Sequence, residues 1–182
     1  IQILDAQTAN SIAAGEVVER PASVVKELVE NALDAGASVI QVEIRQGGIA
    51  SIRITDNGCG MDEEDAKLSF ARHATSKIRS IDDLEAIHTM GFRGEALASI
   101  AAVAKVRLET RLLGSDSGTL IEIAAGDLTT VRPIGCPEGT SITIESLFFN
   151  TPARFKFLKK DSSEAAAIAD ILERMALARP DV

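Results

Sequence analysis

Four polar side chains between residues 27 and 34 have types and a spacing that could do chemistry: Glu27, Glu30, Asn31 and Asp34. Intervals of three, four and seven residues would place them on one stripe of a helix. Carboxylate and carboxamide oxygens suit Mg²⁺, which typically keeps several waters and binds substrate phosphates. A carboxylate beside such a metal can orient a water for attack on phosphorus. The alternative is a solvated acidic face, which the stripe taken alone favours.

A second group of residues is Asp56-Asn57-Gly58-Cys59-Gly60. Asn-Gly is a strong turn signal in any protein, so a plain turn is one interpretation. In the other interpretation, the Asp56 carboxylate accepts a hydrogen bond from an amino group, while Gly58 and Gly60 let the backbone approach a flat ring. The segment alone does not decide between the two. Its place after the polar stripe favours the binding site.

A third group, Gly91-Phe92-Arg93-Gly94-Glu95-Ala96-Leu97, stands where a helix should open. Free backbone N–H groups at a helix N-terminus bind phosphate, and glycines permit close approach. The alternative is an ordinary corner between two helices. The chain contains neither a Walker A sequence nor GxGxxG, which excludes P-loop and Rossmann nucleotide sites.

The polar stripe needs a helix that begins after Arg20, with Pro21 tolerated in its first turn and Gly36 marking its end. The opposite side of this helix is apolar and should face the core: Val24, Val25, Leu28, Val29, Ala32 and Leu33. Two alternating segments, 39–45 and 49–55, predict a hairpin whose turn is Gly47-Gly48.

Further helices are expected over residues 5–19, 62–73, 81–89 and 95–104, with strands filling most of 105–145. The last helix should begin near Asp161, with Glu164 completing a capping box. Its apolar stripe would be Ile168, Ile171, Leu172 and Met175. Helices clustered early, with strands divided around them, predict an α+β fold with a mixed sheet covered on one face.

Composition fits one globular domain. The chain has 182 residues, of which 46% are hydrophobic and 25% charged. No apolar run has the length of a membrane span, and no signal-peptide pattern opens the chain. The net charge of −8 argues against nucleic-acid binding over the whole surface. Since there is no initiator Met, we expect a piece of a longer protein.

The three groups, in this order, resemble the GHKL ATPases, which include gyrase, heat-shock chaperones, histidine kinases and MutL. The first motif of that family, Glu, then Asn four residues later, then Asp-Ala, stands here as Glu27, Asn31 and Asp34-Ala35. The second, Asp-x-Gly-x-Gly, stands as residues 56–60. The MutL branch is indicated by four further segments: residues 12–18, 72–78, 91–97 and 150–154.

This resemblance implies a Bergerat-type fold, a two-layer α/β sandwich that binds ATP with Mg²⁺ between the sheet and a mobile lid. It makes Glu27 the general base for the attacking water and Asn31 the ligand that holds Mg²⁺ against the phosphates. Asp34, Gly58 and Gly60 join the nucleotide site. Asp56 reads the adenine amino group, with Thr140 beside it. The lid and phosphate cradle are Thr75, Ser76, Lys77, Gly91, Phe92, Arg93, Gly94, Glu95, Ala96 and Leu97.

The resemblance also implies slow ATP hydrolysis that serves as a switch in DNA mismatch repair. ATP would drive association into a homodimer that links MutS to a downstream endonuclease and helicase, with DNA bound by the parent protein. Residues 1–182 would be the ATPase domain, followed in the parent by a transducer-like domain and a C-terminal dimerisation domain. A bacterial cytoplasm, associated with the nucleoid, is the expected location. Histidine kinase activity is disfavoured because Glu27 would activate water.

Overall fold

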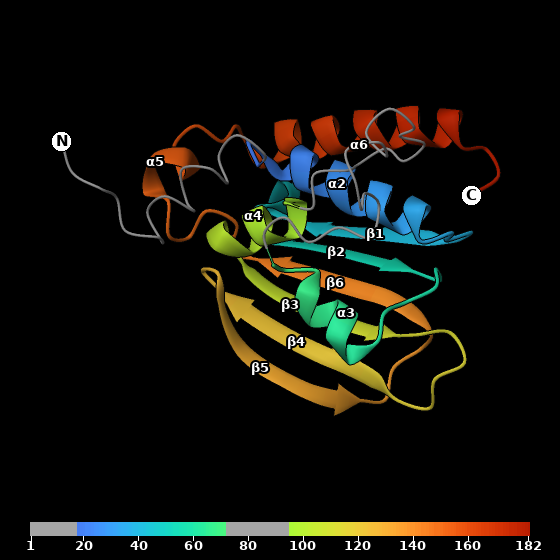
Figure 1. The fold of residues 1–182 in the computed structure, drawn as a ribbon. Coiled ribbons are helices and arrows are strands. Elements are labelled where there is room, and N and C mark those ends of the chain that lie inside the picture. The colour runs from blue at the N-terminus through green and yellow to red at the C-terminus, as the bar shows by residue number, and fades with distance from the viewer. Residues whose placement is uncertain (1–17, 72–94) are drawn as a thin grey trace, which may run out of the picture.

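A six-stranded sheet is the frame of the molecule (Figure 1). The computed structural model describes residues 18–71 and 95–182. Along the sheet the strand order is β1-β2-β6-β3-β4-β5. The strands are β1 Ile40–Arg45, β2 Ser51–Asp56, β3 Lys105–Arg111, β4 Gly118–Ala124, β5 Asp127–Ile134 and β6 Gly139–Glu145. The helices expected over 5–19 and 81–89 lie outside the described residues, apart from the end of the first.

All pairings among the described strands are antiparallel, so the prediction of a mixed sheet is wrong for this part of the chain. A mixed sheet needs at least one pair of parallel neighbours, and strands joined through a helix can form such a pair. β2 and β3 are joined in this way and do point in the same direction. However, β6 lies between them and runs the opposite way. The α+β class itself is confirmed.

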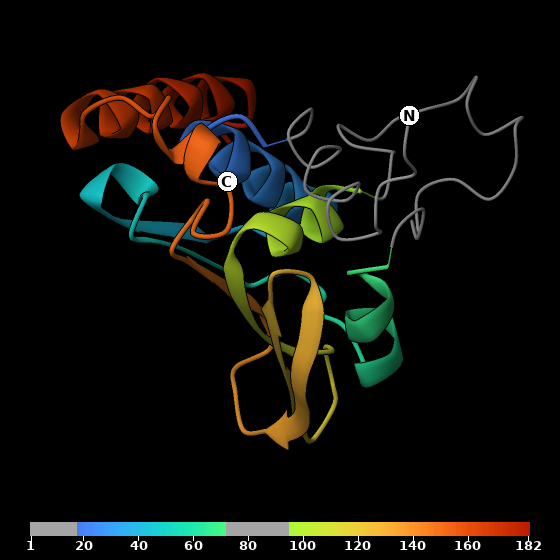
Figure 2. The same cartoon turned by 90° about the vertical axis from the view of Figure 1, so that its left-hand side faces the viewer.

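Helices form the second layer (Figures 1 and 2). They are α2 Pro21–Asp34, α3 Glu63–Leu68, α4 Ala96–Val103, α5 Pro152–Phe155 and α6 Asp161–Ala178. α2 packs on β2, α3 on β4, and α4 on β3 and β4, while α6 packs on α2. The expected two-layer arrangement is therefore confirmed. Among the described helices, none combines the length and apolar character needed to cross a bilayer.

Helix α2 forms as its sequence predicts. Pro21 stands at its start, and all six apolar residues expected to face the core are buried. After the C-cap residue Ala35, Gly36 has a φ of +74°, a left-handed conformation that glycine adopts without strain. Of the polar stripe on α2, only Glu30 is buried.

The β1–β2 hairpin has a longer turn than predicted. A 3₁₀ turn, η1 (Gln46–Gly48), leads through Ile49 and Ala50 into β2. A Cβ atom at Gly48 would approach Pro21 to 2.9 Å and Ile168 to 3.1 Å, so this turn packs tightly beneath α2 and α6. Asp62 caps α3 by accepting from the Asp65 N–H at 2.8 Å, and α3 ends earlier than the predicted residue 73.

Helix α6 begins at Asp161, but the predicted capping box is wrong. The N-cap residue is Lys160, and the Glu164 carboxylate accepts from the Lys159 backbone N–H at 2.9 Å and from Arg20. Glu164 is therefore committed to a residue far away in the sequence. The predicted apolar stripe of α6 is confirmed, since Ile168 is buried and the other three side chains pack against the core.

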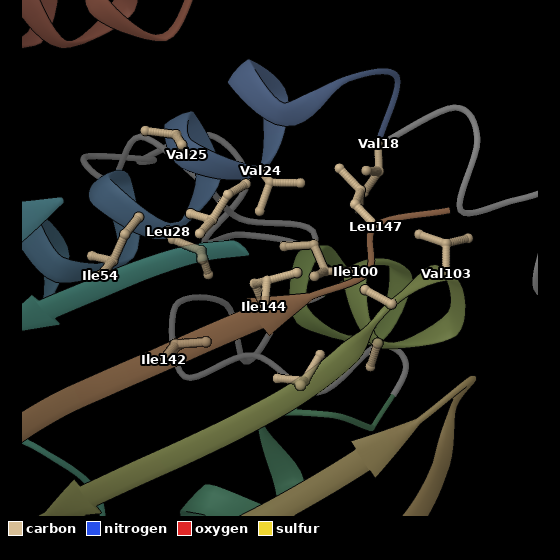
Figure 3. Packing of buried hydrophobic residues seen from close by; sticks show 14 of the residues in the cluster. Val18, Val24, Val25, Leu28, Ile54, Ile100, Val103, Ile142, Ile144 and Leu147 are labelled. Atoms are coloured by element: carbon tan, nitrogen blue, oxygen red, sulfur yellow. The ribbon is translucent and has the colours of Figure 1, made fainter. Parts of the chain in front are cut away.

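The core lies between the sheet and helices α2 and α4 (Figure 3). The sheet contributes two cross-strand rows of apolar side chains to the core. The first row is Ile54, Ile142, Leu108 and Ile121, and the second is Ile52, Ile144, Val106 and Ile123. Val24 and Leu28 of α2 and Ile100 of α4 cover them (Figure 3). The other face of the sheet carries polar side chains such as Arg53 and Arg107.

Candidate functional site

One cross-strand row on the inner face of the sheet is polar instead of apolar. Next to the row of Ile54 and Ile142, the cross-strand neighbours are Asp56 of β2, Thr140 of β6, Thr110 of β3 and Thr119 of β4. Thr110 is fully buried and Thr119 is 6% exposed. Buried polar groups cost free energy unless they are hydrogen-bonded. Four polar side chains in one row therefore mark the end of the core and the start of a site.

Asp56 is a half-buried carboxylate at the end of β2. Its Oδ1 accepts from the Gly58 N–H at 2.9 Å. Burial raises the pKa of Asp56 above its ordinary value, while the backbone N–H groups of Gly58 and Thr140 act in the opposite direction. Because burial outweighs these two donors, an additional donor from a ligand would stabilise the charged form.

The loop that follows Asp56 is fixed between α2 and β3. The Cys59 N–H donates to the Ala35 carbonyl at 3.0 Å, and a Cβ atom at Gly58 would lie 2.8 Å from the Ala35 Cβ. Gly60 has a φ of +67°, and a Cβ there would overlap the Arg111 carbonyl. The absence of a side chain at Gly58 and Gly60 thus lets this loop pack closely against Ala35 and Arg111. The structure brings the first two sequence motifs together here.

The polar stripe of α2 divides into two parts. Glu30 is buried and its Oε1 lies 3.3 Å from Lys26 Nζ, so it belongs to an ion pair within the helix. Glu27 and Asn31 are partly exposed, and Asp34 is exposed. The interpretation of the whole stripe as a solvated face is therefore wrong for Glu30. In residues 18–71 and 95–182, no three His, Cys, Asp or Glu side chains gather as a metal site.

Only part of the expected phosphate cradle falls within the described residues. Glu95 is the N-cap residue of α4, and Ala96 and Leu97 form its first turn; all three are partly buried. The Ser99 N–H donates to the Glu95 carbonyl at 2.9 Å, which confirms that the helix opens here. The remaining predicted cradle and lid residues lie outside the described residues: Thr75, Ser76, Lys77, Gly91, Phe92, Arg93 and Gly94.

Thr110 was not predicted from the sequence as part of the site. Its hydroxyl lies 3.0 Å from the Thr140 hydroxyl and 3.1 Å from the Gly139 carbonyl oxygen, and it accepts from the Met61 N–H at 3.0 Å. A signal was available, because Val106 and Leu108 alternate as core residues and the next inward position is threonine. A polar residue continuing an apolar alternation should have drawn attention.

Residues 19–132 match the model of the family described as histidine kinase-, DNA gyrase B-, and HSP90-like ATPase. The chain belongs to this ATPase family. Within the family, its sequence is similar along its whole length to MutL DNA mismatch repair proteins. The protein of Desulforamulus reducens is 60% identical over 182 residues, and that of Pelotomaculum thermopropionicum is 58% identical over 182 residues.

Solved structures agree with this membership of the GHKL-type ATPases. The Aquifex aeolicus MutL ATPase domain complexed with ADP is 37% identical, with a TM-score of 0.71; the match covers 91% of this chain and 58% of that one. The N-terminal domain of a DNA repair protein gives a TM-score of 0.79 at 27% identity, covering 96% of this chain and 50% of that one. The chain spans 28% of the D. reducens protein and 30% of the P. thermopropionicum protein.

Proposed function

We propose that this chain binds ATP and, in its parent protein, hydrolyses it slowly with Mg²⁺ as the nucleotide switch of a MutL-type DNA mismatch repair protein. The main support for the proposal is the polar row that begins at Asp56. This row lies where the core ends, beside α2. The row offers a half-buried carboxylate next to apolar surface, as an adenine ring with an exocyclic amino group requires. Membership of the ATPase family supports the same ligand.

In this proposal Asp56 accepts a hydrogen bond from the adenine amino group, and Thr140 lies beside it as its cross-strand neighbour. Gly58 and Gly60 allow the loop after Asp56 to pack against Ala35 and Arg111. The phosphates would extend toward the N-terminus of α4, which Glu95, Ala96 and Leu97 form, because backbone N–H groups at a helix N-terminus bind phosphate. Residues 91–94 and 75–77 complete the phosphate cradle and the lid.

Mg²⁺ fits the exposed part of the α2 stripe. The Asn31 carboxamide offers one hard oxygen, and a cation that keeps waters and binds phosphates needs few protein ligands. When bound, Mg²⁺ supplies neutralisation of the phosphate charge. Glu27, one helical turn before Asn31, would accept the proton of the attacking water, and Asp34 would support the site at the end of α2.

Beyond this domain, the similarity to MutL proteins supports a role for the parent protein in the assemblies of DNA mismatch repair. ATP would promote homodimerisation and couple MutS to a downstream endonuclease and helicase on DNA, in the bacterial cytoplasm near the nucleoid. Residues 1–182 would be the ATPase domain, and transducer-like and dimerisation domains would follow in the parent. Transfer of phosphate to a histidine is the rival activity, and a radiolabelled phosphohistidine would establish it.

The test is Glu27→Ala in the full-length protein, with Glu64→Ala on the exposed face of α3 as the matched control. We expect phosphate release to fall by about a hundredfold or more, as for loss of a general base, while affinity for an unhydrolysable ATP analogue stays unchanged. Undiminished turnover would exclude Glu27 as the base. If mismatch repair in cells survives Glu27→Ala, hydrolysis is dispensable and the switch alone is the function.

A further inference from the structure

The buried hydroxyl of Thr110 has every hydrogen-bonding position in use. A threonine hydroxyl has one hydrogen to donate and two lone pairs that accept. Thr110 Oγ1 accepts from the Met61 N–H at 3.0 Å and donates to the Gly139 carbonyl oxygen at 3.1 Å. One lone pair remains, and the only other neighbour in the described hydrogen-bond network is the Thr140 hydroxyl at 3.0 Å.

This count fixes the direction of the bond between the two threonines. Since the Thr110 hydrogen is directed to the Gly139 carbonyl, the Thr140 hydroxyl must donate to Thr110. The Thr140 oxygen then presents only lone pairs to its other surroundings. Asp56, the neighbour of Thr140 on the next strand, is also an acceptor when charged. The row thus offers two acceptors side by side.

We infer that Thr110 is a positioning and specificity-determining residue, which holds the Thr140 hydroxyl as an acceptor and so makes the site select a base with an amino group over one with a carbonyl group. The inference rests on the proposed binding of adenine by Asp56 and Thr140. An adenine amino group donates to both acceptors. The 6-carbonyl of hypoxanthine or guanine would face two acceptors, an unfavourable contact that a freely rotating Thr140 hydroxyl would relieve.

The test measures the ratio of ATP affinity to ITP affinity by calorimetry, using the full chain and its Thr110→Val variant. Valine keeps the shape but removes the hydroxyl, so Thr140 becomes free to donate to the inosine carbonyl. We expect ATP affinity to fall by about threefold to tenfold, the value of one net hydrogen bond, and ITP affinity to rise. Thr110→Ser keeps the hydroxyl and should keep the ratio of the unmodified chain, and Thr143→Val, on the opposite face of β6, should leave the ratio unchanged.

Two outcomes separate this inference from the proposed function. If the unmodified chain does not prefer ATP to ITP, or Asp56→Asn leaves ATP affinity unchanged, the proposed adenine site fails. If both hold and Thr110→Val keeps the full preference, only the role of Thr110 is overturned. In a Thr140→Val background, Thr110→Val should have no further effect on the ratio, since Thr110 acts through Thr140; an effect of full size would overturn the inference.

A second measurement needs no substitution and covers the case in which Thr110→Val does not fold. The hydrogen bond between Thr140 and Thr110 can be followed in the unmodified chain by NMR of the two hydroxyl protons. The Thr140 hydroxyl proton should remain hydrogen-bonded to Thr110 when ATP binds. Its transfer to a hydrogen bond with the nucleotide would overturn the inference.

Discussion

Two carboxylates of this chain are withdrawn from solvent in contrasting ways. Glu164 is 1% exposed, and its oxygens accept from Arg20 Nε at 3.1 Å, Arg20 Nη2 at 3.0 Å and the Lys159 N–H at 2.9 Å. Asp56 is only half-buried and accepts from backbone N–H groups. In residues 18–71 and 95–182, no Lys or Arg forms an ion pair with Asp56.

The difference distinguishes a structural group from a binding group. Glu164 joins the start of α2 to the start of α6 and has its partners inside the protein, so burying it is compensated. Asp56 carries a desolvation cost that its two backbone donors do not remove, since its pKa remains raised. A hydrogen-bond donor on a ligand can compensate this desolvation cost. Altering Glu164 should therefore change stability, whereas altering Asp56 should change binding.

The largest effect is expected from Glu164→Ala. Removing one partner of a buried ion pair leaves the other uncompensated and costs about 3–5 kcal/mol. The Arg20 side chain is 33% exposed and can reach water, so we expect the lower end of this range. The free energy of unfolding in urea measures the loss, and nucleotide affinity of the folded fraction should not change.

Asp170→Ala is the control for this effect. Asp170 forms an ion pair with Arg174 on the same helix at 2.9 Å, but both side chains are exposed, so its loss should cost less than about 1 kcal/mol. Equal losses for Glu164→Ala and Asp170→Ala would contradict the structural role of Glu164. Weakened nucleotide binding in folded Glu164→Ala would show that the two carboxylates are not separate in function.

A smaller effect, on affinity, is expected from Asp56→Asn. In the proposed adenine site, replacing the carboxylate would remove a charge-assisted hydrogen bond to the adenine amino group, worth roughly 1.5–3 kcal/mol. ATP affinity should therefore fall by about tenfold to a hundredfold in calorimetric titration. Asp65→Asn, at an exposed position of α3, is the control and should bind as the unmodified chain does. Unchanged affinity in Asp56→Asn would mean that Asp56 does not read the base.

The sequence predicted what depends on local pattern. The pattern of apolar residues predicted α2, the hairpin and the strands of 105–145. The resemblance to the GHKL ATPases singled out Asp56 and Thr140, which the structure brings together as cross-strand neighbours. The sequence did not predict that β6 lies between β2 and β3, because strand order depends on packing between distant segments. Arg20, the partner of Glu164, lies 144 positions away in the sequence and was not predicted for the same reason. The pair of Lys26 and Glu30 has the local i,i+4 spacing and could have been predicted.

Thr110 shows a different limit of sequence reasoning. Its break in the apolar alternation after Val106 and Leu108 is a weak signal, because threonine is common in strands and no neighbouring motif assigns it to a site. Its importance arises only when β6 and β3 pair so that Thr110 faces Thr140 and the loop after Asp56 brings Met61 to it. A site residue that acts through contacts across strands requires the register of the sheet.

The smallest predicted effect concerns stability without nucleotide. The pKa of Asp56 is raised above 3.8 because burial disfavours its charged form. The folded state therefore binds this proton more tightly than the unfolded state, so the contribution of Asp56 to stability is fully present below 3.8 and is lost as pH rises through its folded pKa. Near neutral pH the charged carboxylate is a net cost.

Asp56→Asn should consequently make the nucleotide-free chain more stable than the unmodified chain near neutral pH, although it binds ATP less well. The advantage should shrink as pH falls toward 3.8, where the carboxyl becomes neutral in both states. Urea unfolding at several pH values measures the difference, and saturating ATP should reverse the order of stability. If the Asn variant were instead less stable at neutral pH, Asp56 would be a structural carboxylate like Glu164, and the contrast between the two would fail.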